Sequence, residues 1–181
     1  MSRVQLIDSS VAPAASKALL DQIHGAFGAT PNMFRAVANS PAALKSMWGA
    51  FGALGGGVLP PQLTEKIAVA VADRNRCEYC LAAHTALGRK AGASADEMSA
   101  AQAGNSTDPK TAAALRFALQ VVESRGQIAD ADVQAVRAAG FSDEEIVEIL
   151  AHVALNLFTN YVNVAFAVPV DFPGVKLRKA A

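Results

Sequence analysis

Residues 65–84, EKIAVAVADRNRCEYCLAAH, decide the fold, because they can be read as two helices joined by a tight bend. The first arm is apolar enough to be buried and ends in the polar group DRNR at positions 73–76. Asn75 is suited to the left-handed backbone conformation that ends many helices. The second arm carries both cysteines of the chain, Cys77 and Cys80. The stretch therefore predicts a helical hairpin with two thiols just after the bend.

The hairpin fixes the positions of four side chains relative to one another. Cys77, Cys80 and His84 fall at i, i+3 and i+7, so a helix places them on one face, with Cys77 in its first turn. With the bend at Arg74 and Asn75, Glu65 and His84 lie about ten residues from it on opposite arms, at similar heights along the two helices. We expect a carboxylate, an imidazole and two thiols to meet at one place.

Residues 67–72, IAVAVA, alternate large and small side chains, a pattern that taken alone favours a β-strand. A helix is the better interpretation for two reasons. Pro60 and Pro61 suit a helix start, and Leu63 and Ile67 follow the helical period. Nothing else in the sequence offers a strand with which this segment could pair.

The composition favours an all-α fold. Hydrophobic residues make up 52% of the 181 residues, but aromatic residues only 6%, and alanine is abundant. This combination suits close helix packing and is poor in the β-branched and aromatic residues that strands prefer. No linker rich in Pro, Gly or Ser divides the chain, so residues 1–181 are expected to form a single domain.

Charge and hydropathy limit the classes of partner. The 16 basic and 16 acidic residues cancel, and no stretch concentrates Lys or Arg, which argues against nucleic acid and anionic membranes. The N-terminus lacks the apolar core of a signal peptide, and no uninterrupted apolar stretch of about 18 residues occurs, so we expect a soluble, cytoplasmic protein. The high apolar fraction and the zero net charge predict self-association into a homo-oligomer.

Pro, Gly, Ser and Asp residues outline about nine helices. Residues 1–14 are expected to form an extended arm, and the final DFPGVKLRKAA an extended tail. Ser94 with Glu97, and Ser142 with Glu145, have the spacing of capping boxes. The helices are predicted to begin near residues 16, 31, 41, 61, 77, 94, 109, 130 and 142, and the last runs to about residue 167.

One polar stripe interrupts the last long helix. His152, Asn156, Asn160 and Asn163 fall at i, i+4, i+8 and i+11 on an otherwise apolar helix. Buried polar groups must be hydrogen-bonded, so the stripe is expected to face a polar pocket, a helix terminus or a subunit interface. A satisfied structural network without chemistry is an equally open alternative.

The CxxC pattern admits three interpretations. In a redox dithiol, the start of the helix would stabilise a thiolate, His84 would accept its proton and Glu65 would orient the imidazole. The same four residues could complete a tetrahedral zinc site, although no second CxxC or HxxxH supplies the usual distant ligand pair. Buried inert cysteines are the third possibility. Two closely spaced cysteines in a reducing compartment favour redox chemistry, and no cofactor is expected.

The order of Glu65, then CEYC at 77–80, then His84 resembles the core motif of the alkylhydroperoxidase D family, within the carboxymuconolactone decarboxylase superfamily. The motif covers about residues 59–92, and NYVNVAFAVPVDFP at 160–173 resembles the end of the larger peroxidase-related members. The resemblance implies an all-helical fold, assembly into trimers or hexamers, and a thiol-dependent peroxidase activity.

By the same resemblance, Cys80 is the peroxidatic thiol, Cys77 the resolving thiol, and Glu65 and His84 form the proton relay. The substrate would be a peroxide and the reductant a dithiol, which is a lipoyl protein for the best-known member. Tyr79 stands where that member has a second histidine, which puts the activation of Cys77 and the lipoyl partner in doubt. The decarboxylase branch lacks the cysteine pair, so lactone decarboxylation is a lesser alternative. A non-catalytic redox sensor or a structural oligomer is the alternative from another class.

Overall fold

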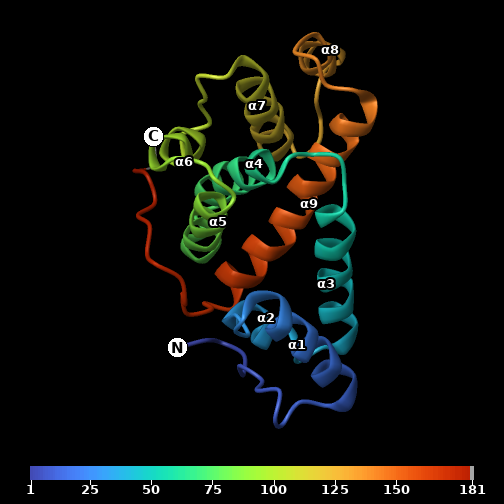
Figure 1. Cartoon of the computed structure of the whole chain (residues 1–181), viewed down its shortest axis with the longest axis vertical. Coiled ribbons are helices and arrows are strands. Elements are labelled where there is room, and N and C mark those ends of the chain that lie inside the picture. The colour runs from blue at the N-terminus through green and yellow to red at the C-terminus, as the bar shows by residue number, and fades with distance from the viewer. Residues whose placement is uncertain (180–181) are drawn as a thin grey trace.

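Helices make up the regular secondary structure of the protein. The computed structural model describes residues 1–179, and this range contains nine α-helices and no β-strand (Figure 1). The prediction of an all-α fold with about nine helices is confirmed. The helices are α1 (Ala14–Phe27), α2 (Asn32–Val37), α3 (Pro41–Gly55), α4 (Pro61–Arg74), α5 (Glu78–Lys90), α6 (Ala95–Gln102), α7 (Pro109–Glu123), α8 (Asp130–Ala138) and α9 (Asp143–Ala165).

Local capping signals determine where several helices begin and end. The hydroxyl groups of Ser94 and Ser142 accept hydrogen bonds from the N–H groups of Glu97 and Glu145. Each glutamate carboxylate accepts in return from the N–H group of its serine, so both predicted capping boxes are confirmed. Gly28 ends α1 in the left-handed conformation with φ 74°, which a glycine adopts without strain.

Helix α4 lies at the centre of the fold. It contacts α5, α6, α7 and α9, as the central position of its ribbon indicates (Figure 1). Ile67, Val69 and Val71 are completely buried, and the alanines between them are buried as well. A helix that is apolar around its whole circumference is one that the rest of the protein encloses. The alternation in IAVAVA therefore marks a helix buried on all sides and not a strand.

A cluster of aromatic rings joins α1, α2 and α3. The Phe34 ring centroid lies 5.9 Å from that of Phe27, 5.8 Å from that of Trp48 and 5.7 Å from that of Phe51. Phe34 is buried, whereas Trp48 and Phe51 are half-buried at the edge of the core. Several of these rings also line a cavity beside the hairpin, so the cluster forms one wall of the site.

The extended segments at the two ends of the chain pack against the helices. The N–H group of Arg3 donates to the carbonyl of Phe166 at 2.7 Å, and that of Asn32 donates to Asp171 Oδ2 at 2.7 Å. In Figure 1 the red C-terminal tail runs from the end of α9 toward α6. The tail therefore packs beside the α4–α5 hairpin. Among the residues described, no helix combines the length and the apolar character that crossing a membrane requires.

Candidate active site

The bend between α4 and α5 positions the two thiols. Arg76 takes up the left-handed conformation with φ 58°, while Asn75 has φ −85°, so the prediction that Asn75 would be left-handed is wrong. The Asn75 side chain instead donates from Nδ2 to Asn160 Oδ1 at 2.9 Å. The N–H group of Cys77 closes the bend by donating to the Ala72 carbonyl at 2.9 Å. The hairpin itself is present as predicted.

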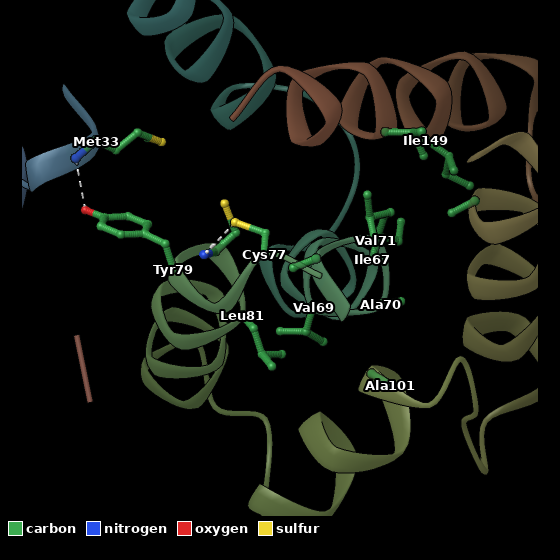
Figure 2. Packing of buried hydrophobic residues seen from close by; sticks show 14 of the residues in the cluster. Met33, Ile67, Val69, Ala70, Val71, Cys77, Tyr79, Leu81, Ala101 and Ile149 are labelled. Atoms are coloured by element: carbon green, nitrogen blue, oxygen red, sulfur yellow. Dashed lines mark hydrogen bonds between the residues drawn. The ribbon is translucent and has the colours of Figure 1, made fainter. Parts of the chain in front are cut away.

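Cys77 caps the helix that carries Cys80. It is the N-cap of α5 with extended backbone angles of φ −94° and ψ 93°, and does not lie in the first turn as predicted. The Cys80 N–H group donates to Cys77 Sγ at 3.3 Å, so the sulfur takes the place of the usual cap oxygen (Figure 2). Both cysteines are free thiols and are buried, with exposed fractions of 1% and 2%.

Helix α9 supplies polar groups to the Cys80 sulfur. Asn163 Nδ2 donates to Cys80 Sγ at 3.2 Å, and Thr159 Oγ1 lies 3.9 Å from the same sulfur. The hydrogen bond with Cys77, the charge of His84 and the Asn163 amide lower the pKa of Cys80 against the effect of its burial. The pKa of Cys77 is raised by its hydrogen bond with Cys80 and by burial. Of the two thiols, Cys80 is the one stabilised as a thiolate.

Glu65 and His84 contact each other across the hairpin, as the predicted register requires. The His84 Nδ1–H group donates to Glu65 Oε2 at 2.7 Å, and the two side chains are 13% and 20% exposed. Burial lowers the pKa of His84, but the Glu65 carboxylate outweighs burial, so the net effect is a raised pKa. Within residues 1–179, His84 forms no hydrogen bond with either sulfur, so it acts on Cys80 through its charge.

The polar stripe of α9 faces this site. His152, Asn156, Asn160 and Asn163 are all buried, with exposed fractions of 9%, 5%, 0% and 3%. The sequence identified the stripe but not the role of Asn163 as a donor to a sulfur, and Thr159 was missed. The spacing contained the signal, because Asn156, Thr159 and Asn163 fall at i, i+3 and i+7 on one helical face.

Known proteins share both the sequence pattern and the fold. Residues 41–124 match the model of the carboxymuconolactone decarboxylase family, and the matched segment contains Glu65, Cys77, Cys80 and His84. This part of the chain is similar to the carboxymuconolactone decarboxylase family. No curated protein gives a significant match to the sequence.

Solved structures extend the likeness beyond the family segment to most of the chain. An alkylhydroperoxidase D core structure, of an uncharacterized peroxidase-related protein from Ralstonia eutropha JMP134, is 25% identical with a TM-score of 0.84, covering 94% of this chain and 92% of that one. A peroxidase-related protein from Silicibacter sp. TM1040 is 24% identical with a TM-score of 0.81, covering 93% and 91%. A variant of the debrominase Bmp8 in complex with 2,3,4-tribromopyrrole is 20% identical with a TM-score of 0.79, covering 94% of each chain. The alkylhydroperoxidase D-like fold is confirmed.

Two cavities adjoin His84. The smaller, of about 40 Å³, is lined mainly by apolar side chains and reaches Cys80. The larger, of about 250 Å³, is lined by Glu65, His152 and Asn156 among others. His84 and Thr159 line both cavities. Cys80 therefore faces an apolar cavity, and Glu65 faces a more polar one.

Tyr79, between the two cysteines, is directed away from them. The Met33 N–H group donates to the Tyr79 hydroxyl at 3.2 Å, which joins α5 to α2 (Figure 2). The Tyr79 ring contacts Phe172 of the tail edge-on, with ring centroids 5.7 Å apart. Burial and the nearby Asp171 carboxylate raise the pKa of the hydroxyl. Tyr79 therefore stays protonated and holds α2 and the tail against α5, so it supplies no second base.

The zinc alternative requires that Glu65, His84 and both thiols converge on one point. In the structure the Glu65 carboxylate accepts a hydrogen bond from the His84 imidazole. The Cys77 sulfur accepts from the Cys80 N–H group, and the Cys80 sulfur accepts from Asn163 of α9. Over residues 1–179, no three His, Cys, Asp or Glu side chains are placed so that they could hold a metal ion.

Proposed function

We propose that this protein is a thiol-dependent peroxidase that reduces a peroxide with Cys77 and Cys80. The proposal depends above all on the surroundings of the Cys80 sulfur, where the Asn163 amide donates at 3.2 Å. Burial alone raises the pKa of a thiol. Hydrogen-bond donors that lower the pKa of Cys80 are expected for a nucleophile, whereas an inert core cysteine does not require them.

In the first step the Cys80 thiolate attacks the terminal oxygen of the peroxide. A sulfur–oxygen bond forms as the oxygen–oxygen bond breaks, so Cys80 is oxidised to a sulfenic acid and an alkoxide leaves. The alkoxide takes a proton from His84. Glu65, which accepts a hydrogen bond from His84 Nδ1 at 2.7 Å, stabilises the protonated imidazole beforehand and orients its ring.

In the second step the Cys77 sulfur attacks the sulfenic sulfur of Cys80. The disulfide bond forms, the sulfur–oxygen bond breaks, and the departing hydroxide leaves as water with the proton of the Cys77 thiol. The hydrogen bond of 3.3 Å from the Cys80 N–H group to Cys77 Sγ supports this step, because it keeps the two residues together at the start of α5. An external dithiol then returns the disulfide to two thiols by exchange.

A second candidate function is the removal of bromine from a small aromatic ring. The aromatic side chains of Phe27, Phe34 and Phe51 around the cavity at Cys80 favour it, as does the likeness to the debrominase. The dithiol would supply two electrons and form the disulfide, a proton would take the place of bromine on the ring carbon, and bromide and the second thiol proton would be released. At about 40 Å³ this cavity is smaller than the roughly 150 Å³ that holds a benzene molecule, so a peroxide is the better fit. Bromide released from 2,3,4-tribromopyrrole would reverse this preference.

Counting thiols tests the peroxidase proposal directly. The reduced protein should lose two thiols on treatment with one equivalent of an alkyl hydroperoxide, without any gain of mass from oxygen. Cys80→Ser should abolish peroxide consumption, and Cys77→Ser should leave a sulfenic acid at Cys80. Repeated turnover with dithiothreitol separates an enzyme from a redox sensor. Two free thiols after excess peroxide would contradict the proposal.

We also propose that the protein forms a homo-oligomer through the exposed face of α9. Val147, Phe158 and Tyr161 on this helix are 66%, 37% and 59% exposed although their side chains are largely apolar. They fall at i, i+11 and i+14, which places them in one stripe. The family resemblance implies a trimer or a hexamer. The free thiols suit a reducing compartment, so we propose a cytoplasmic location.

A further inference from the structure

The cavity of about 250 Å³ beside the relay contains polar atoms to which no protein group bonds. Within residues 1–179, His152 Nε2 and Asn156 Oδ1 are buried without a hydrogen-bond partner, and both residues line this cavity. The two residues are 9% and 5% exposed and lie one turn apart on α9. Buried polar groups are nearly always hydrogen-bonded, so we expect these two atoms to bond to a molecule that enters the cavity.

Hydrogen bonding and charge define the kind of molecule that fits. The Asn156 amide donates from Nδ2 to the His152 carbonyl at 2.9 Å, so Oδ1 is the acceptor left for a ligand. Burial lowers the pKa of His152 although the Glu148 and Glu65 carboxylates oppose it, so the imidazole is neutral at neutral pH. A hydroxyl group suits both atoms, because it donates to Oδ1 and accepts from Nε2–H. An anion is disfavoured, because the Glu65 carboxylate also lines the cavity.

Much of the remaining cavity wall is apolar. Phe51 and Leu54 of α3, Leu59 before α4 and Leu155 of α9 all line it. Its volume of about 250 Å³ exceeds the roughly 150 Å³ that holds a benzene molecule. The cavity therefore suits a short hydrocarbon chain that carries one hydroxyl group.

The position of the cavity shows which part of a peroxide can reach it. Phe51, His84 and Thr159 line both this cavity and the apolar one at Cys80, so the two adjoin there. When a thiolate displaces an alkoxide, the sulfur, the attacked oxygen and the leaving oxygen lie nearly in line. The carbon chain is attached to the leaving oxygen, which takes its proton from His84, and therefore extends away from Cys80 into the polar cavity. The apolar cavity of about 40 Å³ has room for the two oxygen atoms, since about 10–15 Å³ suffices for one water molecule.

We propose that the polar cavity binds the carbon chain of the peroxide through a hydroxyl group, so that the preferred substrate is a short, uncharged hydroperoxide with a hydroxyl group at its far end. The inference rests on the peroxidase function proposed above. Asn156 Oδ1 accepts a hydrogen bond from the substrate hydroxyl, and His152 Nε2–H donates to it. The oxygen–oxygen bond breaks as the sulfur–oxygen bond to Cys80 forms, and the alkoxide takes the His84 proton and leaves as a diol.

A matched pair of hydroperoxides tests the preference. 3-Hydroperoxypropan-1-ol and n-butyl hydroperoxide have the same chain length and differ in that a hydroxyl group replaces the terminal methyl group. The rate of thiol loss in the reduced protein is measured with each, and divided by the rate of the same peroxide with free cysteine. A site built to bond a hydroxyl group rejects an analogue that lacks it, so the hydroxylated peroxide should react about tenfold faster or more. Equal normalised rates, or a faster reaction of n-butyl hydroperoxide, would overturn the proposal.

Two substitutions test which residues bind the hydroxyl group. Asn156→Leu removes the acceptor and His152→Leu removes the donor, so each should bring the ratio of the two normalised rates close to one. Asn160→Leu is the matched control, because Asn160 is a buried asparagine one turn further along α9 that lies outside the lining of this cavity. The control should keep the ratio of the wild type, since a general loss of reactivity affects both peroxides equally. A wild-type ratio in both Asn156→Leu and His152→Leu would refute the assignment.

A charged analogue and a different oxidant complete the test. 3-Hydroperoxypropanoate carries a carboxylate in place of the hydroxyl group and should react more slowly than n-butyl hydroperoxide, whereas a rate equal to that of the hydroxylated peroxide would contradict a site for uncharged groups. A wild-type protein that forms its disulfide with diamide but with none of the hydroperoxides would instead contradict the peroxidase function on which the inference rests.

Discussion

Replacing Glu65 with glutamine tests the proton relay, because the substitution keeps the shape of the side chain and removes its charge. The hydrogen bond from His84 Nδ1 to Glu65 Oε2 is 2.7 Å long and largely shielded from solvent. Hydrogen bonds to charged groups contribute about 1.5–3 kcal/mol, compared with about 0.5–1.5 kcal/mol for neutral pairs. Glu65→Gln should therefore cost roughly 1–2 kcal/mol of imidazolium stabilisation, which corresponds to a roughly five- to thirtyfold slower reaction.

The assay is the rate at which the reduced protein loses thiols after rapid mixing with excess alkyl hydroperoxide, measured over a range of pH. Because the Glu65 charge raises the pKa of His84, the alkaline limb of the profile should move to lower pH in Glu65→Gln. Glu97→Gln is the control. It removes a carboxylate of α6 that accepts a hydrogen bond of 2.7 Å from Lys66, the neighbour of Glu65 on α4. A wild-type rate in Glu65→Gln, or an equal loss in both variants, would refute the relay.

The contacts of α9 and of His84 lead to three further expectations. Asn163→Ala removes the amide donor at Cys80, so iodoacetamide should alkylate Cys80 several-fold more slowly near neutral pH, and an unchanged rate would argue against the donor role. Folding raises the pKa of His84 above its unfolded value of 6.5, so protonated His84 stabilises the folded state fully below pH 6.5. This stabilisation is lost as the pH rises through the pKa of the folded protein. Urea unfolding of wild type and Glu65→Gln should therefore converge toward alkaline pH. Light scattering should show a homo-oligomer that Tyr161→Lys dissociates, and a monomeric wild type would contradict assembly through α9.

The pairing of Glu65 with His84 was predictable because it depends on local geometry alone. The rise per residue and the position of the bend determine the register of the two helices. An error of one residue in the bend lengthens one arm and shortens the other, so it moves the register by about 3 Å, which is less than the reach of a glutamate side chain. The pair was therefore predicted correctly even though the left-handed residue is Arg76 and not Asn75.

The detailed conformation of the bend depends on a contact that local sequence does not reveal. The Asn75 side chain bonds to Asn160, which lies 85 residues further along the chain. With Asn75 held in this contact, Arg76 takes the left-handed conformation and Cys77 becomes the N-cap of α5. Rules for single helices assign the left-handed position to asparagine. They fail here because they do not include contacts with another helix, in this case α9.

The polar stripe shows what periodicity can and cannot predict. It identifies the residues that share a face of α9, but the packing of α9 against α4 and α5 decides that Asn163 meets Cys80. Within the described chain, His152 Nε2 and Asn156 Oδ1 are buried without a protein partner, at the cavity of about 250 Å³ beside Glu65. A buried polar atom left unsatisfied costs about 1–3 kcal/mol, so this cavity suits water or a polar ligand. Glu65 lines this polar cavity, while Cys80 lines the apolar one. In the proposed peroxidase, this separation would let the proton of Cys80 leave toward the polar cavity while the sulfur stays on the apolar side.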